Sequence, residues 1–238
     1  MAASAPSVTT ETNHTPGARS IRELVFGVND GLVSITGLLA GVTAAHRTSH
    51  TILIAGLAAV AAATVSMALG QFLSAQAQNE YFQAEYAREL REVEEVPEQE
   101  QQEVEDILQN MGFTGDEAAS FTRRLMSDKK HWVDFMMKEE LGIVMDQDSP
   151  WVSAGIMALA VIAGSLPPML PYIIIPQPSV AFVWAIGLGI LTAFALGSVK
   201  AYVARGVWWR SGTQFVLVVA GAVVIGILAG QALGALFG

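Results

Sequence analysis

Apolar residues are concentrated in five long stretches of the chain, at about residues 24–45, 51–77, 151–175, 179–199 and 213–237. Each stretch is long enough to cross roughly 30 Å of hydrocarbon as an α-helix, which takes about 20 residues. The second stretch contains no charged residue, and the first is interrupted only by Asn29 and Asp30. Five such stretches in one short chain argue against core helices of a soluble protein. The pattern therefore predicts an all-α membrane protein with five transmembrane helices.

The segment between the second and third stretches, residues 80–148, is polar but also has a helical pattern. Residues 80–95 contain neither Pro nor Gly and are rich in good helix formers, so we expect them to continue the second span into water. Pro97 suits the first turn of a new helix and Gly112 suits its end. Between these two, apolar residues recur at helical spacing, namely Val104, Ile107, Leu108 and Met111.

Two further amphipathic helices are predicted at residues 116–130 and 131–141, with Gly142 ending the second. Three short helices folded against the continued second span would make a small domain. We therefore predict four parts: a disordered tail without the features of a signal peptide, two spans, an acidic helical domain and three more spans. Their bounds are residues 1–20, 21–79, 80–148 and 149–238.

Composition separates charge from apolarity along the chain. Apolar residues make up 52% of the chain and charged residues 15%, against about 25% charged residues in an average soluble domain. The net charge is −9, and all but three of the 22 acidic residues lie in residues 80–148. These features exclude an ordinary soluble globule and a basic nucleic-acid-binding protein. The absence of cysteine excludes a disulfide scaffold, thiol catalysis, zinc fingers and iron–sulfur clusters.

Positive charge is distributed unequally between the predicted loops. Arg47 is the only Lys or Arg between the first two spans, and the other 12 of the 13 lie before the first span, in residues 80–148, or between the fourth and fifth spans. Because cytoplasmic loops carry an excess of Lys and Arg, we expect the N-terminus and residues 80–148 to face the cytoplasm. The C-terminus is expected on the opposite side.

Asp30 and Met67 are candidate ligands inside the predicted spans. Asp30 lies six residues into the first span, and a charged side chain within a membrane helix costs about 2.5–3.5 kcal/mol on insertion scales. The thioether of Met67 is a soft ligand that suits late transition metals. The alternatives are an acid solvated near the interface and a Met that only packs. One carboxylate and one thioether are too few for an ion, so we expect a homodimer that doubles them.

Acidic residues and methionines also gather in the polar segment. Glu85, Glu89 and Glu92 share one helix face, and like charges at this spacing destabilise a helix unless cations offset them. Met136, Met137 and Glu140 lie three or four residues apart on another helix. Carboxylates combined with thioethers suit Fe²⁺ better than Ca²⁺. A solvated acidic surface and a packed methionine core are the alternatives. His131 could be a further ligand, although a lone histidine is more often a surface residue.

Four segments of the chain resemble the vacuolar iron transporter family. They are FGVNDGLVS (26–34), SMALGQFLSAQAQNEYF (66–82), EEVPEQEQQEVEDIL (94–108) and WVDFMMKEELGI (132–143). The resemblance implies five transmembrane helices, a homodimer, a helical metal-binding domain and proton-driven export of Fe²⁺ from the cytoplasm. It places Asp30 and Met67 on the translocation path. It assigns cytoplasmic metal binding to Glu89, Glu92, Glu100, Glu103, Met136, Met137 and Glu140.

Our hypothesis from the sequence is a dimeric, non-enzymatic Fe²⁺/H⁺ antiporter whose acidic domain collects the metal, with Mn²⁺, Co²⁺ or Zn²⁺ as other cargo. The partners are a second copy, membrane lipid, divalent metal ions and protons. The host membrane would be the plasma membrane in a bacterium and the vacuolar membrane in a eukaryote. A membrane-anchored metal buffer or sensor is the alternative. A di-iron oxidase is disfavoured because such sites use two Glu-x-x-His pairs, and the only pair in this sequence, Glu11 and His14, lies in the predicted disordered tail.

Overall fold

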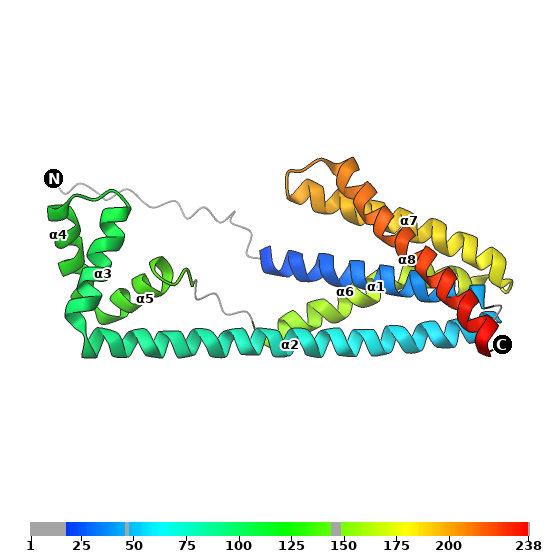
Figure 1. The fold of residues 1–238 in the computed structure, drawn as a ribbon, viewed down its shortest axis with the longest axis horizontal. Coiled ribbons are helices and arrows are strands. Elements are labelled where there is room, and N and C mark those ends of the chain that lie inside the picture. Colours follow the sequence, from blue (N-terminus) through cyan, green and yellow to red (C-terminus); the bar gives the residue numbers. More distant parts are fainter. Residues whose placement is uncertain (1–17, 46–47, 144–148, 238) are drawn as a thin grey trace, which may run out of the picture. The chain divides into compact units, whose positions relative to one another are not determined.

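The computed structural model describes residues 18–45, 48–143 and 149–237, and within these residues the chain is entirely helical (Figure 1). The predicted tail falls largely outside the described residues, as does Arg47. The helices are α1 (Ala18–Ala44), α2 (Ser49–Glu95), α3 (Pro97–Asn110), α4 (Gly115–Met126), α5 (Lys129–Glu139), α6 (Pro150–Ile174), α7 (Pro178–Val203) and α8 (Trp208–Phe237).

The chain divides into two compact units. We call the described parts of residues 1–71 and 151–238 the apolar unit, and those of residues 72–150 the acidic unit. Helix α2 passes from the first into the second, so it runs without a break from the second apolar stretch through residues 80–95, as predicted.

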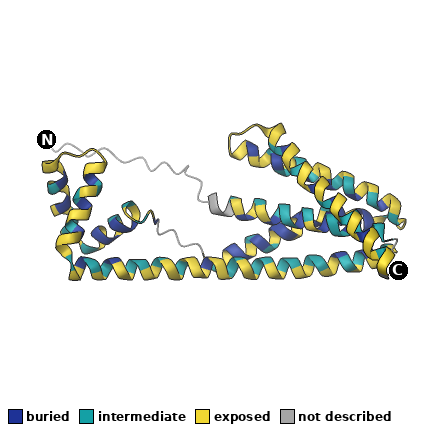
Figure 2. Cartoon of the chain, viewed as in Figure 1, coloured by how far each residue is buried: buried dark blue, intermediate teal, exposed yellow. Residues whose placement is uncertain are grey.

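Five helices are long and apolar enough to cross a membrane, which confirms the five apolar spans expected from the sequence. They are Ile21–Ala44, Ser49–Glu95, Pro150–Ile174, Pro178–Val203 and Trp208–Leu236. Many of their large apolar side chains are exposed (Figure 2), as expected for surfaces that contact lipid. The chain is therefore an integral membrane protein.

Glycines allow α1 to pack closely against its neighbours in the apolar unit. A Cβ atom on Gly226 of α8 would collide with the carbonyl oxygen of Gly37, and one on Gly230 with that of Gly41. On another side of α1, a Cβ on Gly164 of α6 would collide with the carbonyl of Val28. Small residues at this spacing let membrane helices approach through their backbones. Helix α1 therefore packs tightly against both α6 and α8.

The acidic unit has its own hydrophobic core, which includes Val104, Leu108, Trp132, Val133 and Met136. Helix α3 begins at Pro97, as predicted, and Gly112 just beyond its end has φ +98°, a conformation that favours glycine. These features make α3, α4 and α5 a small helical assembly around the second part of α2.

The predicted boundary between the last two helices of the acidic unit was wrong. The sequence suggested one helix at 116–130 and the next at 131–141, but α4 ends at Met126 and α5 already begins at Lys129. The Asp128 carboxylate accepts hydrogen bonds from the backbone N–H groups of Lys130 and His131. Asp128 is thus the N-cap of α5, which sets the start of the helix.

Candidate metal site

Three glutamates on α2 surround one arginine. Arg88 lies 3.1 Å from a carboxylate oxygen of Glu85, 3.7 Å from one of Glu89 and 3.4 Å from one of Glu92. The Glu89 side chain is 1% exposed, whereas that of Arg88 is 47% exposed. One cation therefore balances only part of the negative charge on this face of α2.

Two carboxylate oxygens of this region are buried without a hydrogen-bond partner among the described residues. They are Oε2 of Glu89 on α2 and Oε2 of Glu100 on α3. Glu100 itself is 4% exposed. A buried acceptor without a partner costs about 1–3 kcal/mol, and more when it is charged. Such oxygens are available to bind a proton or a cation.

Burial and mutual repulsion raise the pKa values of these glutamates. Burial raises the pKa of Glu89 to about 7, and the charges of Glu140 and Glu100 add to the rise. Burial also raises the pKa of Glu100 to about 7, followed by the charge of Glu103. The pKa of Glu140 is raised by burial and then by Glu103. Arg88 opposes all three shifts.

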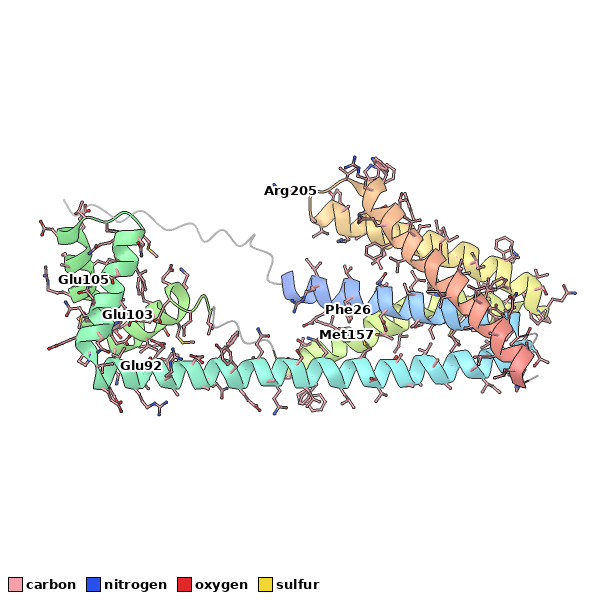
Figure 3. The ribbon with its side chains drawn as sticks, viewed as in Figure 1. Phe26, Glu92, Glu103, Glu105, Met157 and Arg205 are labelled. Carbon is pink, nitrogen blue, oxygen red and sulfur yellow. The ribbon has the colours of Figure 1, made fainter. Side chains whose placement is uncertain are left out.

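These interactions bring together the predicted carboxylates from separate parts of the sequence. Glu92 on α2 and Glu103 on α3 are labelled in Figure 3, and both act on the buried Glu100. Glu140, at the end of α5, completes the group. We call the five predicted residues the glutamate cluster; they are Glu89, Glu92, Glu100, Glu103 and Glu140.

Met136 and Met137 lie in the hydrophobic core of the acidic unit, at 0% and 1% exposure. Helix α5 therefore carries both thioethers and leads directly to Glu140. Both side chains pack in this core, which shows that they have a structural role. A ligand role requires that a sulfur turn from this core toward the carboxylates.

The glutamate cluster is an open arrangement and not a closed cage. Among the described residues, no three or more His, Asp or Glu side chains have the arrangement of a metal site as the chain stands. The charges of the glutamate cluster nevertheless raise the pKa values of Glu89 and Glu100, so its carboxylates are close enough to repel one another. A cation would have to draw the side chains inward to complete its coordination.

The two candidate ligands of the spans lie in the apolar unit. Asp30 on α1 and Met67 on α2 are both half-buried. Ser34, one turn after Asp30, donates its hydroxyl to the Asp30 backbone carbonyl at 2.6 Å. Thr36 donates in the same way to the carbonyl of Leu32. Both hydroxyls are thus used within α1, and their oxygens can only accept hydrogen bonds from outside it.

A polar contact that the sequence analysis missed lies near these residues. Gln71 of α2 donates to a carboxylate oxygen of Glu23 on α1 at 2.7 Å, and Glu23 is 3% exposed. Glu23 lies seven residues before Asp30, so both are on one face of α1. This spacing was the available signal, but only the structure shows that Gln71 meets the acid.

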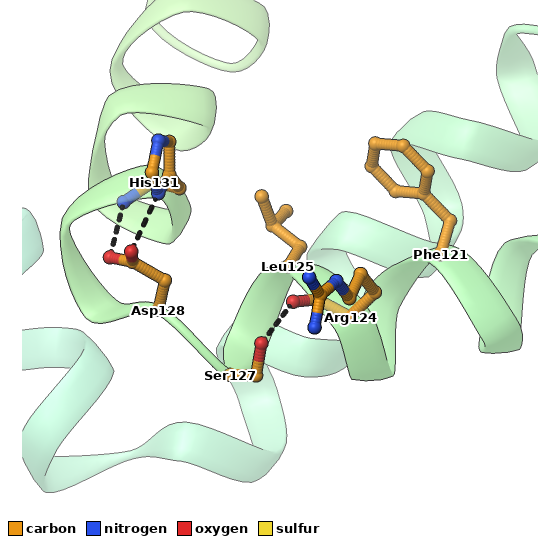
Figure 4. Close-up of a pocket in the computed structure, with 6 residues that line it drawn as sticks. All are labelled: Phe121, Arg124, Leu125, Ser127, Asp128 and His131. Carbon is orange, nitrogen blue, oxygen red and sulfur yellow. Dashed lines mark hydrogen bonds and ion pairs between the residues drawn. The ribbon is translucent and has the colours of Figure 1, made fainter. Parts of the chain in front are cut away.

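His131 lies beside a pocket of about 350 Å³ in the acidic unit (Figure 4). Its Nδ1 atom is 2.8 Å from the Asp128 carboxylate, and its side chain is 72% exposed. Hydrogen bonding with His131 lowers the pKa of Asp128. His131 is thus an exposed residue paired with the N-cap of its own helix.

Sequence comparisons connect this arrangement with known proteins. The profile described as the VIT family matches residues 21–231. "Vacuolar iron transporter 2" of Oryza sativa subsp. japonica is 34% identical over 80% of this chain and 78% of its own. "Vacuolar iron transporter 1" of Arabidopsis thaliana is 34% identical over 81% and 77%. "Protein CCC1" of Saccharomyces cerevisiae is 27% identical over 90% and 67%.

Proposed function

Because this chain belongs to the VIT family, we propose that it exports Fe²⁺ from the cytoplasm across its membrane in exchange for protons. The observation that carries the proposal is the glutamate cluster, in which two buried carboxylate oxygens have no partner among the described residues. The five apolar helices supply the membrane part of the transporter. The names of the relatives support iron as the cargo.

In this proposal, the acidic unit collects Fe²⁺ at the glutamate cluster. Glu89 and Glu100, whose pKa values are about 7, each hold a proton for roughly half of the time near neutral pH. An arriving cation displaces these protons and pairs with the carboxylates, because metal and proton compete for the same oxygens. Met136 and Met137 add soft ligands that favour Fe²⁺, or Mn²⁺, Co²⁺ and Zn²⁺, over Ca²⁺.

The membrane step uses Asp30 and Met67 of two copies of the chain. A two-fold dimer brings two carboxylates and two thioethers to a shared path, which offers four donors to one cation. Protonation of Asp30 from the far side weakens its hold on the cation and releases it. The acidic unit and the N-terminus face the cytoplasm, as the distribution of Lys and Arg suggests.

Metal flux into proteoliposomes tests this function. Vesicles that contain the full chain should accumulate Fe²⁺ when their interior is more acidic than the medium. Uptake should fall when this pH gradient is collapsed. Asp30→Asn keeps the shape of the side chain but removes its charge. Because changing even a group that only supports a metal ligand costs about 10- to 100-fold, we expect uptake to fall by at least about 100-fold. Asp134→Asn, on the exposed surface of α5, is the matched control.

Full pH-driven uptake by the Asp30→Asn protein would remove Asp30 from the mechanism. Metal binding without any flux in the unmodified protein would instead establish a membrane-anchored buffer or sensor.

A further inference from the structure

A pocket of about 410 Å³ lies among α1, α7 and α8 in the apolar unit. It is formed where α1 begins, α7 ends and α8 begins, which are neighbouring parts of this unit in Figure 1. Its apolar lining includes Val25, Phe26 and Phe215. Two cationic side chains, Arg22 of α1 and Lys200 of α7, line the same pocket. The pocket therefore combines an apolar floor with positive charge from two helices.

The two cations have no acidic counterpart in the part of the chain that the structure describes. None of the described residues that line the pocket is acidic, and neither Arg22 nor Lys200 forms an ion pair with a described residue. Lys200 instead places its Nζ atom 5.6 Å from the centre of the Phe215 ring, a cation–π contact. The charge of both side chains is available to an anion.

Positive charge continues along the start of α8. A second hollow, of about 270 Å³, is lined by Lys200, Arg210 and Ser211. The Ser211 hydroxyl is buried without a hydrogen-bond partner among the described residues. Lys200 borders both hollows, so an anionic group beside it would be approached by cations from α1, α7 and α8.

The position of the pocket favours a lipid over a free anion. Trp208 and Trp209 at the start of α8 are 58% and 52% exposed, and such aromatic residues gather at membrane–water interfaces. Phe26, labelled in Figure 3, is 57% exposed in a helix that crosses the membrane. A free phosphate would leave this apolar surface uncovered, whereas an acyl chain would cover it.

We propose that this pocket binds an anionic phospholipid. The phosphate lies between Arg22 and Lys200, and the upper part of an acyl chain lies over Phe26 and Phe215. Basic pockets between membrane helices are suited to anionic head groups. The bound lipid links the ends of α1, α7 and α8, and α1 also carries the translocation-path candidate Asp30.

Native mass spectrometry of the full chain in detergent, titrated with phosphatidylglycerol or phosphatidylcholine, tests the proposal. The unmodified protein should bind phosphatidylglycerol more tightly. Arg22→Gln with Lys200→Gln should weaken phosphatidylglycerol binding about five-fold for each charge removed. Arg123→Gln with Lys130→Gln removes the same charge from exposed positions of the acidic unit and should leave binding unchanged. Equal losses in the two double variants would overturn the proposal.

Two further variants separate lipid binding from damage to the fold. Arg22→Lys with Lys200→Arg keeps both charges and should retain selectivity for phosphatidylglycerol. Val25→Trp fills the apolar part of the pocket without a change of charge and should weaken phosphatidylglycerol binding while helicity is unchanged. If glycerol phosphate competes fully and Val25→Trp has no effect, the ligand is a free phosphate and the lipid proposal is wrong.

A second copy of the chain is the remaining occupant to exclude. Because the chain contains no cysteine, Phe215→Cys introduces a single thiol in the pocket lining on α8, away from the face of α1 that carries Asp30. We expect no disulfide between copies in oxidised membranes. Efficient cross-linking through this thiol would show that protein, and not lipid, covers the pocket, and would overturn the proposal.

Discussion

Glu89 and Glu100 are the residues in which the acidic unit stores unfavourable electrostatic energy. Each is almost fully buried, each leaves one oxygen without a partner among the described residues, and each has a pKa of about 7. A folded protein tolerates such a carboxyl at low pH, where it is neutral, more easily than at high pH. A bound cation removes the same penalty by neutralising the charge.

The stability of the acidic unit without metal should therefore fall as the pH rises. The folded chain holds protons on Glu89 and Glu100 up to about pH 7, whereas an unfolded chain loses them near the ordinary value of 4.5. Stability present below pH 4.5 is thus lost as the pH rises to about 7, on the order of 3 kcal/mol for each group. The rate of hydrogen exchange at the backbone amides of α3 and α5 measures this loss of stability.

The comparison protein for this experiment is Glu89→Gln with Glu100→Gln, measured at each pH beside the unmodified chain. At pH 8 the variant should exchange more slowly than the unmodified protein, and the difference should vanish at pH 4. Added Fe²⁺ should protect only the unmodified protein. Identical exchange of both proteins at pH 8 would contradict the predicted burial cost.

The glutamates of α3 provide a second prediction at the residue scale. Glu100→Gln with Glu103→Gln should weaken Fe²⁺ binding to the full chain by about 10- to 100-fold, the usual effect of disturbing ligands and their supports. Anaerobic calorimetry measures the affinity. Glu98→Gln with Glu105→Gln removes the same charge from α3 outside the glutamate cluster and should change the affinity little. If both pairs weaken binding equally, only general acidity attracts the metal.

At the scale of elements, α1 is the helix on which the apolar unit is assembled. It contacts α8 backbone to backbone at Gly37 and Gly41, and it contacts α6 at Val28. The same helix carries Glu23, which meets Gln71 of α2, and Asp30. The close packing of α1 therefore sets the position of both Glu23 and Asp30.

A methyl group between α1 and α8 should disturb this packing. Gly230→Ala places a Cβ against the carbonyl of Gly41, and overpacking of this kind costs roughly 1–3 kcal/mol. Thermal unfolding in detergent should show a lower midpoint, and Fe²⁺ flux should fall. Gly221→Ala, on the same helix with nothing within 4 Å of the added Cβ, should not lower the midpoint. Equal midpoints for the two variants would contradict the close contact.

At the scale of the whole molecule, the chain combines a membrane unit with a charged helical unit that has its own core. The two halves of α2 have opposite character, since the first is apolar and the second carries Glu85, Arg88, Glu89 and Glu92. This division is consistent with metal collection in water and metal passage through lipid. It also makes the orientation of the chain in the membrane testable.

Single cysteines should report opposite sides of the membrane. Gln109→Cys lies on exposed α3 and Gln177→Cys lies at the exposed start of α7, in a chain that otherwise has no cysteine. With the protein expressed in the plasma membrane of bacterial cells, an impermeant thiol reagent added to sealed cells should label only Gln177→Cys, and Gln109→Cys should react only after the cells are opened. Labelling of Gln109→Cys in sealed cells would reverse the proposed orientation.

The sequence by itself determined the five spans, the continuation of α2 and the starts and ends of several helices. These features depend on neighbouring residues, because hydropathy over about 20 positions, Pro97 at a helix start and Gly112 beyond a helix end act locally. Helical spacing also singled out Glu89 and Glu92 as residues on one face. It misplaced the start of α5, where the sequence analysis overlooked Asp128 as a cap.

Only the tertiary structure decided which of the many acids are buried. Glu89 and Glu100 resemble their neighbours in the sequence, and they differ because α2, α3 and α5 exclude water from them. The meeting of Glu23 with Gln71, 48 residues apart, arises in the same way. Burial and charge balance depend on contacts between distant segments, and no local pattern contains that information.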